Sequence, residues 1–256
     1  MLHPYLFEGT PYQMHTWETA VMAGLALVTI LAVAKKPRDF PLSRVAIIFL
    51  MGLCFIFGLV GAKLFFIYLN RASIFGVKHL SMDAALVAPG YAFLGALFAE
   101  ALVLAAFTKL RPKRASFLVC ADYLAPFAIL HQAIVRIGCF LNGCCYGKPT
   151  NLPWGCEFFE AGVKRHPTQL YEVVILTFTY FLMRSLYKKG TAPRGVVFFG
   201  TVGIYTSLRF FVEFLRVDNL YVLGNITFTQ MILFVMSACC AIAIGIALIL
   251  QKKRKT

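Results

Sequence analysis

Charged residues are scarce in this chain of 256 residues, and acidic residues are the scarcest class. Only 14% of the residues are charged, and 11 Asp and Glu stand against 25 Lys and Arg, whereas 60% of the chain is hydrophobic. The mean hydropathy is +0.76. So little charge excludes an ordinary soluble domain and is typical of a polytopic membrane protein.

The chain also lacks any recognisable nucleic-acid-binding module, although its net charge is +14. The basic residues lie in short loops between apolar runs, so the charge does not indicate a nucleic-acid partner. No internal repeat, low-complexity run or flexible linker divides the sequence. We therefore expect residues 1–256 to form a single polytopic membrane domain.

Long hydrophobic runs are abundant, and each is close to the roughly 20 residues with which a helix crosses a bilayer. We mark seven of them, at 17–34, 43–69, 86–108, 115–141, 168–187, 195–215 and 228–250. The sequence therefore predicts an all-α integral membrane protein with about seven transmembrane helices.

The basic residues gather on one side of the predicted membrane. Most lie after the first, third and fifth spans or at the end of the chain: Lys35, Lys36, Arg38, Arg44, Lys109, Arg111, Lys113, Arg114, Arg184, Lys188, Lys189, Arg194, Lys252, Lys253, Arg254 and Lys255. By the positive-inside rule this side is cytoplasmic. We expect the N-terminus outside, the C-terminus in the cytoplasm, and segments 70–85 and 142–167 in a small extracytoplasmic head.

Polar side chains collect at the outward ends of the predicted spans. They are Arg136, Asn142, His166, Gln169, Tyr171, Glu172, Arg209, Glu213 and Arg216. Charge at membrane depth is costly and usually functional. Two unpaired arginines from different helices, Arg136 and Arg209, would match phosphate oxygens and form an anion clamp. Buried ion pairs or side chains that reach the lipid headgroups are the alternative interpretation.

Helical spacing relates three of these charges to one another. Arg209 and Glu213 are four residues apart and share one helical face, and Arg216 is expected to join that face seven residues beyond Arg209. Glu213 would then neutralise one arginine while the other remains available. Glu172 lies one turn into its span and requires a cationic or donor partner.

Four of the eight cysteines, Cys139, Cys144, Cys145 and Cys156, cluster in the outward segment. Three interpretations are open: one or two disulfides in an oxidising compartment, inert packing residues, or reactive thiols that form a metal site with His166 or act as a transient acyl or thiol carrier. The spacing lacks the paired Cys-x2-Cys pattern of structural zinc sites, so the metal interpretation is the least favoured and no metal ligand is assigned.

Three blocks of the sequence stand out together. The first block, 136–155, includes Arg136, Gly138, Phe140, Asn142, Gly143, Gly147, Lys148, Pro149, Thr150, Leu152, Pro153, Trp154 and Gly155; the second is 166–172 and the third is 209–216. In content and order these blocks resemble one known family, the phosphatidylglycerol–prolipoprotein diacylglyceryl transferases, and the resemblance extends over the whole chain.

The resemblance implies a bacterial inner-membrane enzyme that transfers diacylglyceryl from phosphatidylglycerol to a cysteine thiol of a lipoprotein precursor. A thioether would form and glycerol 1-phosphate would leave, without a cofactor. The implied partners are phosphatidylglycerol, the precursor's signal peptide and membrane lipid. The implied catalytic residues are Arg136, Arg209, His166 and Glu213, and the implied substrate-binding residues are Gly138, Asn142, Gly147, Gln169, Tyr171, Glu172 and Arg216.

The sequence departs from the family pattern at three positions. Leu94 stands where the family has the His or Tyr that is its proposed general base, and Cys139 and Cys144 stand where it usually has Asn and Glu. Two alternatives follow from these departures. One is a related lipid transferase with a different acceptor, and the other is a non-catalytic membrane protein that binds phospholipid.

Overall fold

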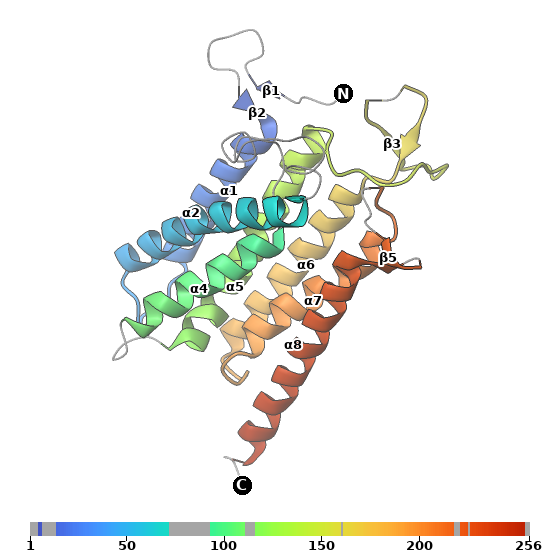
Figure 1. Cartoon of the computed structure of the whole chain (residues 1–256). Helices are drawn as coiled ribbons and strands as arrows, with labels where there is room; N and C mark the ends of the chain where they lie inside the picture. Colours follow the sequence, from blue (N-terminus) through green and yellow to red (C-terminus); the bar gives the residue numbers. More distant parts are fainter. Residues whose placement is uncertain are drawn as a thin grey trace. The chain divides into compact units, whose positions relative to one another are not determined.

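A computed structural model describes residues 5–6, 14–71, 93–110, 116–159, 161–217, 221–224 and 226–253 (Figure 1). Within these ranges it contains seven α-helices: α1 (Thr16–Ala34), α2 (Arg44–Leu69), α4 (Phe93–Lys109), α5 (Phe117–Leu141), α6 (Thr168–Lys189), α7 (Val196–Glu213) and α8 (Phe228–Lys253). Three short hairpins accompany them: β1 (Tyr5–Leu6) with β2 (Met14–His15), β3 (Cys156–Glu157) with β4 (Lys164–Arg165), and β5 (Tyr221–Leu223) with β6 (Ile226–Thr227).

The prediction of an all-helical architecture is confirmed, and five of the helices are long and apolar enough to cross a membrane. These five are α1, α2, α5, α7 and α8. The predicted span 86–108 corresponds to α4, although residues 86–92 lie outside the described part of the chain, as do residues 72–85 of the expected head. The predicted span 195–215 is slightly too long, because α7 ends at Glu213.

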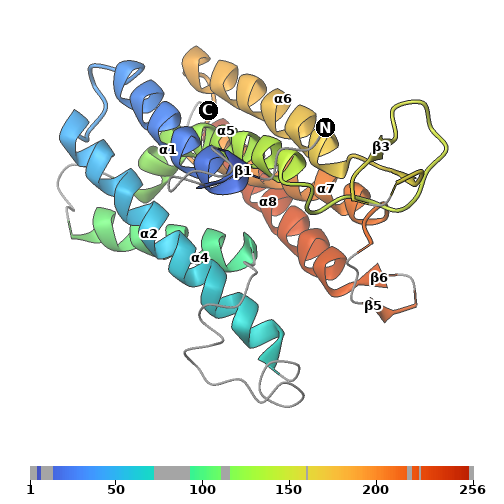
Figure 2. The same cartoon turned by 90° about the horizontal axis from the view of Figure 1, so that it is seen from above.

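The chain comprises two compact units, Ala32–Cys120 and a second that combines Met1–Leu31 with Ala121–Thr256. In the smaller unit, α2 packs along α4 (Figure 2). Gly61 and Gly95 face each other at this crossing, where a Cβ atom on Gly61 would lie 2.5 Å from the Gly95 carbonyl oxygen. Two glycines thus permit the close approach of the helix backbones, as is common between membrane helices.

The larger unit contains α6, α7 and α8 packed side by side (Figure 1). A buried carboxylate from α5 fixes the start of α7, because Asp122 accepts hydrogen bonds from the backbone N–H groups of Gly195 (2.6 Å) and Phe198 (2.8 Å). The start of α8 is a capping box in which Thr227 and Gln230 exchange hydrogen bonds between side chain and backbone. Polar groups at these helix starts are therefore satisfied inside an apolar structure.

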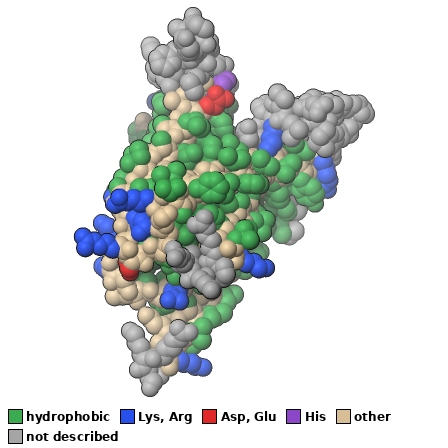
Figure 3. All heavy atoms as spheres, turned by 90° about the vertical axis from the view of Figure 1, so that its left-hand side faces the viewer, with side chains coloured by type: hydrophobic (Ala, Val, Ile, Leu, Met, Phe, Trp, Pro, Cys, Tyr) green, Lys and Arg blue, Asp and Glu red, His purple; other side chains and the backbone are tan. Residues whose placement is uncertain are grey.

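Large hydrophobic side chains cover much of the outer surface. Ile30, Leu102, Phe211 and Phe234 are each more than 60% exposed, and green side chains dominate much of the face drawn in Figure 3. A soluble monomer rarely exposes so extensive an apolar surface. The helices accordingly present their apolar sides outward, as expected where lipid is the solvent.

Candidate functional site

Backbone pairing around Gly147 brings the three sequence blocks together. The Gly147 N–H donates to the carbonyl oxygen of His166 (2.8 Å), and the Lys148 N–H donates to that of Leu215 (2.7 Å). Gly147 also forms an antiparallel bridge with Arg216. A Cβ atom at Gly147 would lie only 2.6 Å from the Leu215 carbonyl oxygen, so a glycine is required at this crossing.

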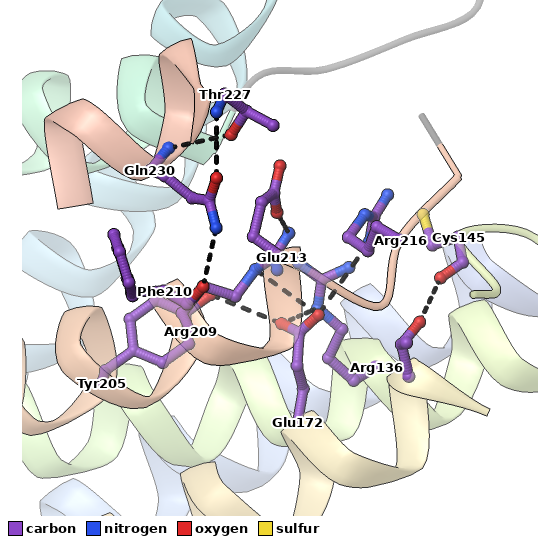
Figure 4. A network of polar contacts seen from close by, with 11 residues as sticks. Arg136, Cys145, Glu172, Tyr205, Arg209, Phe210, Glu213, Arg216, Thr227 and Gln230 are labelled. Carbon is purple, nitrogen blue, oxygen red and sulfur yellow. Dashed lines mark hydrogen bonds and ion pairs between the residues drawn. The ribbon is translucent and has the colours of Figure 1, made fainter. Parts of the chain in front are cut away.

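One buried carboxylate lies at the centre of the charged residues that meet there. Glu172, on α6 and only 1% exposed, approaches three arginines: its Oε2 lies 2.9 Å from Arg136 Nε on α5, and its Oε1 lies 3.6 Å from Arg209 Nε on α7 and 4.0 Å from Arg216 Nη1. Figure 4 shows the three arginines around this carboxylate. A buried charge is tolerated only when it is paired in this way.

We call Arg136, Arg209 and Arg216 with their acidic partners the arginine cluster. The side chains of Glu213 and Tyr205 also contact it. Arg209 Nη2 lies 2.6 Å from Glu213 Oε2, and the hydroxyl of Tyr205 donates to Glu172 Oε2 at 3.5 Å. Three arginines and two glutamates leave a formal charge of plus one. Arg209 Nη1 is buried without a hydrogen-bond partner among the described residues, so a donor remains there for an anion.

These contacts confirm part of the predicted geometry and correct two points. Glu213 does pair with Arg209, as the four-residue spacing predicts. The expectation that the arginines are unpaired is wrong, because Glu172 contacts both Arg136 and Arg209. Arg216 does not continue the helical face, since α7 ends at Glu213; it reaches the cluster through its bridge with Gly147.

Sequence reasoning missed Tyr205, which is 3% exposed and lies between α7 and the Glu172 carboxylate. Its position four residues before Arg209 places both side chains on one helical face. That spacing is the signal that could have identified it.

A thiol cluster, formed by Cys139, Cys144 and Cys145, lies beside the arginine cluster. Its three sulfur atoms all lie within 4.8 Å of one another. Cys145 hydrogen-bonds with the Arg216 guanidinium. The pKa of Cys145 is lowered, first by hydrogen bonds with the Cys139 and Cys144 thiols and then by the charges of Arg216 and Arg136, although burial acts in the opposite direction. The arginines thus favour a thiolate at this position.

The end of α5 explains why two of these thiols meet. Gly143 adopts a left-handed conformation with φ 71°, its N–H donates to the Phe140 carbonyl, and the Cys144 N–H donates to the Cys139 carbonyl. This pattern is a Schellman motif, which places the residue after the glycine against the residue five positions earlier. Cys139 and Cys144 occupy those two positions.

Side chains at the start of α6 hold the rest of the thiol cluster. Thr168 Oγ1 donates to the Cys145 carbonyl oxygen (2.7 Å), and Gln169 Nε2 donates to that of Cys144 (2.5 Å). Cys145 has φ 68°, the one positive value of a non-glycine residue in the described ranges. Such a conformation is costly and persists only where surrounding contacts enforce it.

All eight cysteines are free thiols in the structure. Cys156 lies in β3, and its thiol donates to the carbonyl oxygen of Trp154 (3.6 Å), so it is not a member of the thiol cluster. The three interpretations of the outward cysteines stay predictions, although the structure contains Cys139, Cys144 and Cys145 as neighbouring free thiols.

The remaining predicted residues make contacts of several kinds. The His166 ring shares a hydrogen bond with the Tyr171 hydroxyl (Nδ1 to Oη, 3.1 Å), which also accepts from Trp154 Nε1 (2.9 Å). Asn142 hydrogen-bonds with the Cys144 thiol. Gly138 lies against α1, where a Cβ atom would overlap the side chain of Ala20. Gly138 therefore serves helix packing, whatever else it contributes.

Leu94 lies in the first turn of α4, in the unit Ala32–Cys120, and the clusters described above belong to the other unit. Its role therefore rests on the sequence pattern alone.

Comparison with known proteins adds a second line of observation. The profile of the family described as prolipoprotein diacylglyceryl transferase matches residues 4–249. The chain is 31% identical over 224 residues to the phosphatidylglycerol–prolipoprotein diacylglyceryl transferase of Clostridium tetani, covering 85% of this chain and 86% of that protein. A protein of the same name from Clostridium botulinum is 30% identical over 247 residues, covering 90% and 91%.

A third similar protein matches over a shorter stretch of the chain. The protein of this name from Geobacter sulfurreducens is 40% identical over 128 residues, which is 50% of this chain and 48% of that protein. Similarity thus extends along nearly the whole sequence and is higher over part of it.

Proposed function

The chain belongs to the prolipoprotein diacylglyceryl transferase family, and from this membership and the arginine cluster we propose that it transfers diacylglyceryl from phosphatidylglycerol to a cysteine thiol of a lipoprotein precursor. The products are a thioether-linked lipoprotein precursor and glycerol 1-phosphate. The family relationship supports the reaction, and the buried arginines with a net positive charge support the binding of an anionic phosphate.

The proposed topology has seven membrane spans, with α4 and α6 crossing the bilayer beside the five more apolar helices. The N-terminus is outside, the C-terminus is cytoplasmic, and the arginine and thiol clusters lie toward the outer face of a bacterial inner membrane. The last turns of α6 and α8 support this orientation, since they carry Lys188, Lys189, Lys252 and Lys253. Phospholipid can then enter from the bilayer and the signal peptide from the outer side.

In the proposed site the arginine cluster holds the phosphate of phosphatidylglycerol. Arg209 donates through Nη1, which has no hydrogen-bond partner among the described residues, and Arg136 donates from the neighbouring helix α5. Glu172 and Glu213 orient these guanidinium groups before the substrate arrives. Fixed donors of this kind stabilise charge that develops on the leaving phosphate oxygen, which is where catalysis gains most.

Neighbouring side chains bind the rest of the substrate. The Gln169 Oε1 atom is buried and has no hydrogen-bond partner in the described structure, so it can accept from a glycerol hydroxyl of the headgroup. Asn142 directly follows the end of α5, and its partner Cys144 also accepts a hydrogen bond from Gln169 through its carbonyl oxygen. His166 and Tyr171 lie at the entrance to α6 and hydrogen-bond with each other, and in the proposed site they contact the acceptor peptide.

The observation that carries this proposal is the meeting of Arg136, Arg209 and Arg216 on one buried carboxylate in a chain of this family. We propose to test it with purified protein in phosphatidylglycerol vesicles and a synthetic lipobox peptide that contains a single cysteine. The expected product is a peptide whose mass increases by one diacylglyceryl group, together with released glycerol 1-phosphate.

Two controls separate the proposal from its alternatives. A peptide in which serine replaces cysteine must remain unmodified, and vesicles of phosphatidylcholine must give no glycerol 1-phosphate. Expression in a bacterium depleted of its own transferase should restore lipoprotein modification. Binding of phosphatidylglycerol without transfer to the peptide would contradict the proposal and identify a non-catalytic lipid-binding protein, whereas transfer to a small thiol alone would identify a different acceptor.

A further inference from the structure

We propose that the thiol cluster of Cys139, Cys144 and Cys145 binds a zinc ion, and that this ion activates the thiol of the acceptor cysteine. The inference rests on the proposed function, because it assigns a role within the same transfer reaction. It concerns three residues on which neither the phosphate-binding contacts nor the family resemblance depends.

The geometry of the three thiols fits a zinc ion. Zinc–sulfur bonds of about 2.3 Å place the sulfur atoms of a tetrahedral or trigonal site about 3.8–4.0 Å apart. The three sulfur atoms here lie within 4.8 Å of one another, so side-chain movements of about 1 Å or less bring them to these separations. Soft thiolate ligands select zinc over the harder cations magnesium and calcium.

The site is built rather than accidental. The Schellman motif at the end of α5 brings Cys139 to Cys144, and the hydrogen bonds from Thr168 and Gln169 hold the carbonyl groups of Cys145 and Cys144. Both of these α6 side chains are fully buried. The strained backbone of Cys145 is thus maintained by a shell of polar contacts, as is typical of metal ligands.

The site leaves one coordination position for a substrate. Among the described His, Cys, Asp and Glu residues, the group consists of these three cysteines. Catalytic zinc sites use three protein ligands and keep the fourth position for water or substrate, whereas structural sites are closed by four protein ligands. A three-thiolate site with an open position therefore corresponds to the catalytic class.

The positive charge beside the thiol cluster is also compatible with a bound zinc ion. Zinc with three thiolates carries a formal charge of minus one, and the neighbouring arginine cluster carries plus one. Arg216 connects the two clusters, because it contacts Glu172 (4.0 Å) and hydrogen-bonds with Cys145. The acceptor sulfur on zinc would therefore lie beside the arginines that hold the phosphate.

The proposed step balances without an oxidant or reductant. The acceptor thiol binds zinc through its sulfur and releases its proton to water, because a coordinated thiol is deprotonated. The sulfur electron pair then attacks the glyceryl carbon that carries the phosphate. The carbon–sulfur bond forms as the carbon–oxygen bond breaks, and the oxygen leaves with its electron pair as glycerol 1-phosphate. The thioether product is a weak ligand and dissociates from zinc.

Activation by zinc would supply the thiol deprotonation for which the sequence lacks the family's usual base. The thiolate is the nucleophile in thiol alkylation, so some group must remove the proton. Leu94, at the position where the family has a His or Tyr, has no group that can accept this proton. A zinc ion that binds the thiolate directly replaces the function of that base.

The first test measures metal in the full-length protein. Wild-type protein purified in detergent and dialysed against metal-free buffer should retain about one zinc ion per chain by mass spectrometry of the metal. Cys139→Ser, Cys144→Ser and Cys145→Ser should each lose it, while Cys239→Ser, an exposed cysteine of α8, should retain it. Absence of zinc from the wild type, or equal zinc in all variants, would overturn the inference.

The second test uses wild-type protein and therefore does not depend on the folding of a variant. Replacement of zinc by cobalt(II) should give thiolate-to-cobalt charge transfer and the visible bands of a tetrahedral site. A lipobox peptide with cysteine should shift these bands, and the serine peptide should leave them unchanged. Identical spectra with both peptides would refute thiol activation at the metal.

The outcomes also distinguish this inference from the proposed function. Removal of zinc by 1,10-phenanthroline should abolish transfer to the peptide, and added zinc should restore it. Full transfer by metal-free protein would overturn the zinc inference and leave the transferase function intact. Zinc binding with a peptide-dependent cobalt spectrum, but no transfer under any condition, would support the metal site and contradict the transferase function.

Discussion

Arg136 Nε lies 2.9 Å from Glu172 Oε2, in a contact between α5 and α6 that leaves the carboxylate only 1% exposed. The same carboxylate approaches Arg209 and Arg216, so its single charge organises three positive ones. A buried pair of this kind is costly to desolvate but still more costly to break, because the remaining charges stay buried.

Replacement of the central carboxylate should therefore damage both stability and activity. We expect Glu172→Gln to destabilise the protein by about 3–5 kcal/mol, because the buried arginines lose their shared partner. Thermal unfolding in detergent, followed by size-exclusion chromatography of the soluble fraction, would measure the loss. Glu157→Gln, an exposed position of β3, is the matched control and should unfold like the wild type. Equal unfolding temperatures for both variants would show that Glu172 does not stabilise the cluster.

Arg209 should not be replaceable by lysine. Its Nη2 pairs with Glu213 while Nη1 remains for the phosphate, and a lysine cannot provide both donors in a fixed fork. We expect Arg209→Lys to reduce transfer from phosphatidylglycerol roughly 10²–10³-fold, which is typical for loss of one fixed donor in a charge-stabilising site. The rate of glycerol 1-phosphate release would measure it.

The control for this change is Arg44→Lys at the exposed start of α2. It replaces the same residue type by lysine, so the side chain changes in size and charge in the same way as in Arg209→Lys. It should leave the rate within experimental error. If Arg209→Lys retained more than half of the wild-type rate while the control was normal, the phosphate-binding role of Arg209 would have to be abandoned.

Most helices of this protein follow from the sequence because hydropathy and length are local properties. The apolar runs at 17–34, 43–69 and 115–141 correspond to α1, α2 and α5 with small shifts at their ends. The arginines at 136 and 209 stand out by charge at membrane depth. These predictions need no knowledge of contacts between distant segments.

The position of Arg216 could not be predicted in the same way. Helical periodicity places it on the face of Arg209, but α7 ends three residues earlier, and backbone pairing with Gly147 brings Arg216 to the cluster. A contact across about 70 residues of chain leaves no periodic signal. The central role of Glu172 was missed for the same reason, because it depends on three partners from separate segments.

The thiol cluster could be predicted from the sequence only in part. The meeting of Cys139 with Cys144 follows from local rules once the end of α5 is known, since Gly143 is the left-handed residue of the Schellman motif. Cys145 joins them only because Thr168 and Gln169 of α6 fix its loop. The sequence spacing of the cysteines therefore gave no metal pattern, although their sulfur atoms converge.

Gly147 should not tolerate a side chain. A Cβ atom there would lie 2.6 Å from the Leu215 carbonyl oxygen and 2.8 Å from the His166 Cβ atom, so Gly147→Ala must separate the paired segments. We expect a marked loss of transfer together with a lower unfolding temperature. Gly52→Ala, where a Cβ atom would meet nothing within 4 Å, is the control and should behave like the wild type. A fully active Gly147→Ala protein would mean that the pairing is not needed for the site.

Thr168 should control how firmly the thiol cluster is held. Its hydroxyl donates to the Cys145 carbonyl oxygen at 2.7 Å, and Thr168→Val removes this donor with almost no change in shape. A buried carbonyl that loses its partner costs about 1–3 kcal/mol, so local opening should become roughly 5- to 150-fold more frequent. Alkylation of Cys145 by maleimide, followed by peptide mass spectrometry, would measure that opening directly.

Thr179→Val provides the matched control for the loss of a buried hydroxyl in α6. Thr179 Oγ1 donates to the carbonyl oxygen of Ile175 within the same helix, and that carbonyl also accepts the backbone hydrogen bond of the helix. Removal of the Thr179 hydroxyl therefore leaves the loop of Cys145 unchanged. Its alkylation rate should equal that of the wild type. Equal rates in both valine variants would contradict the view that α6 enforces the strained conformation of Cys145, and a faster rate in Thr168→Val alone would confirm it.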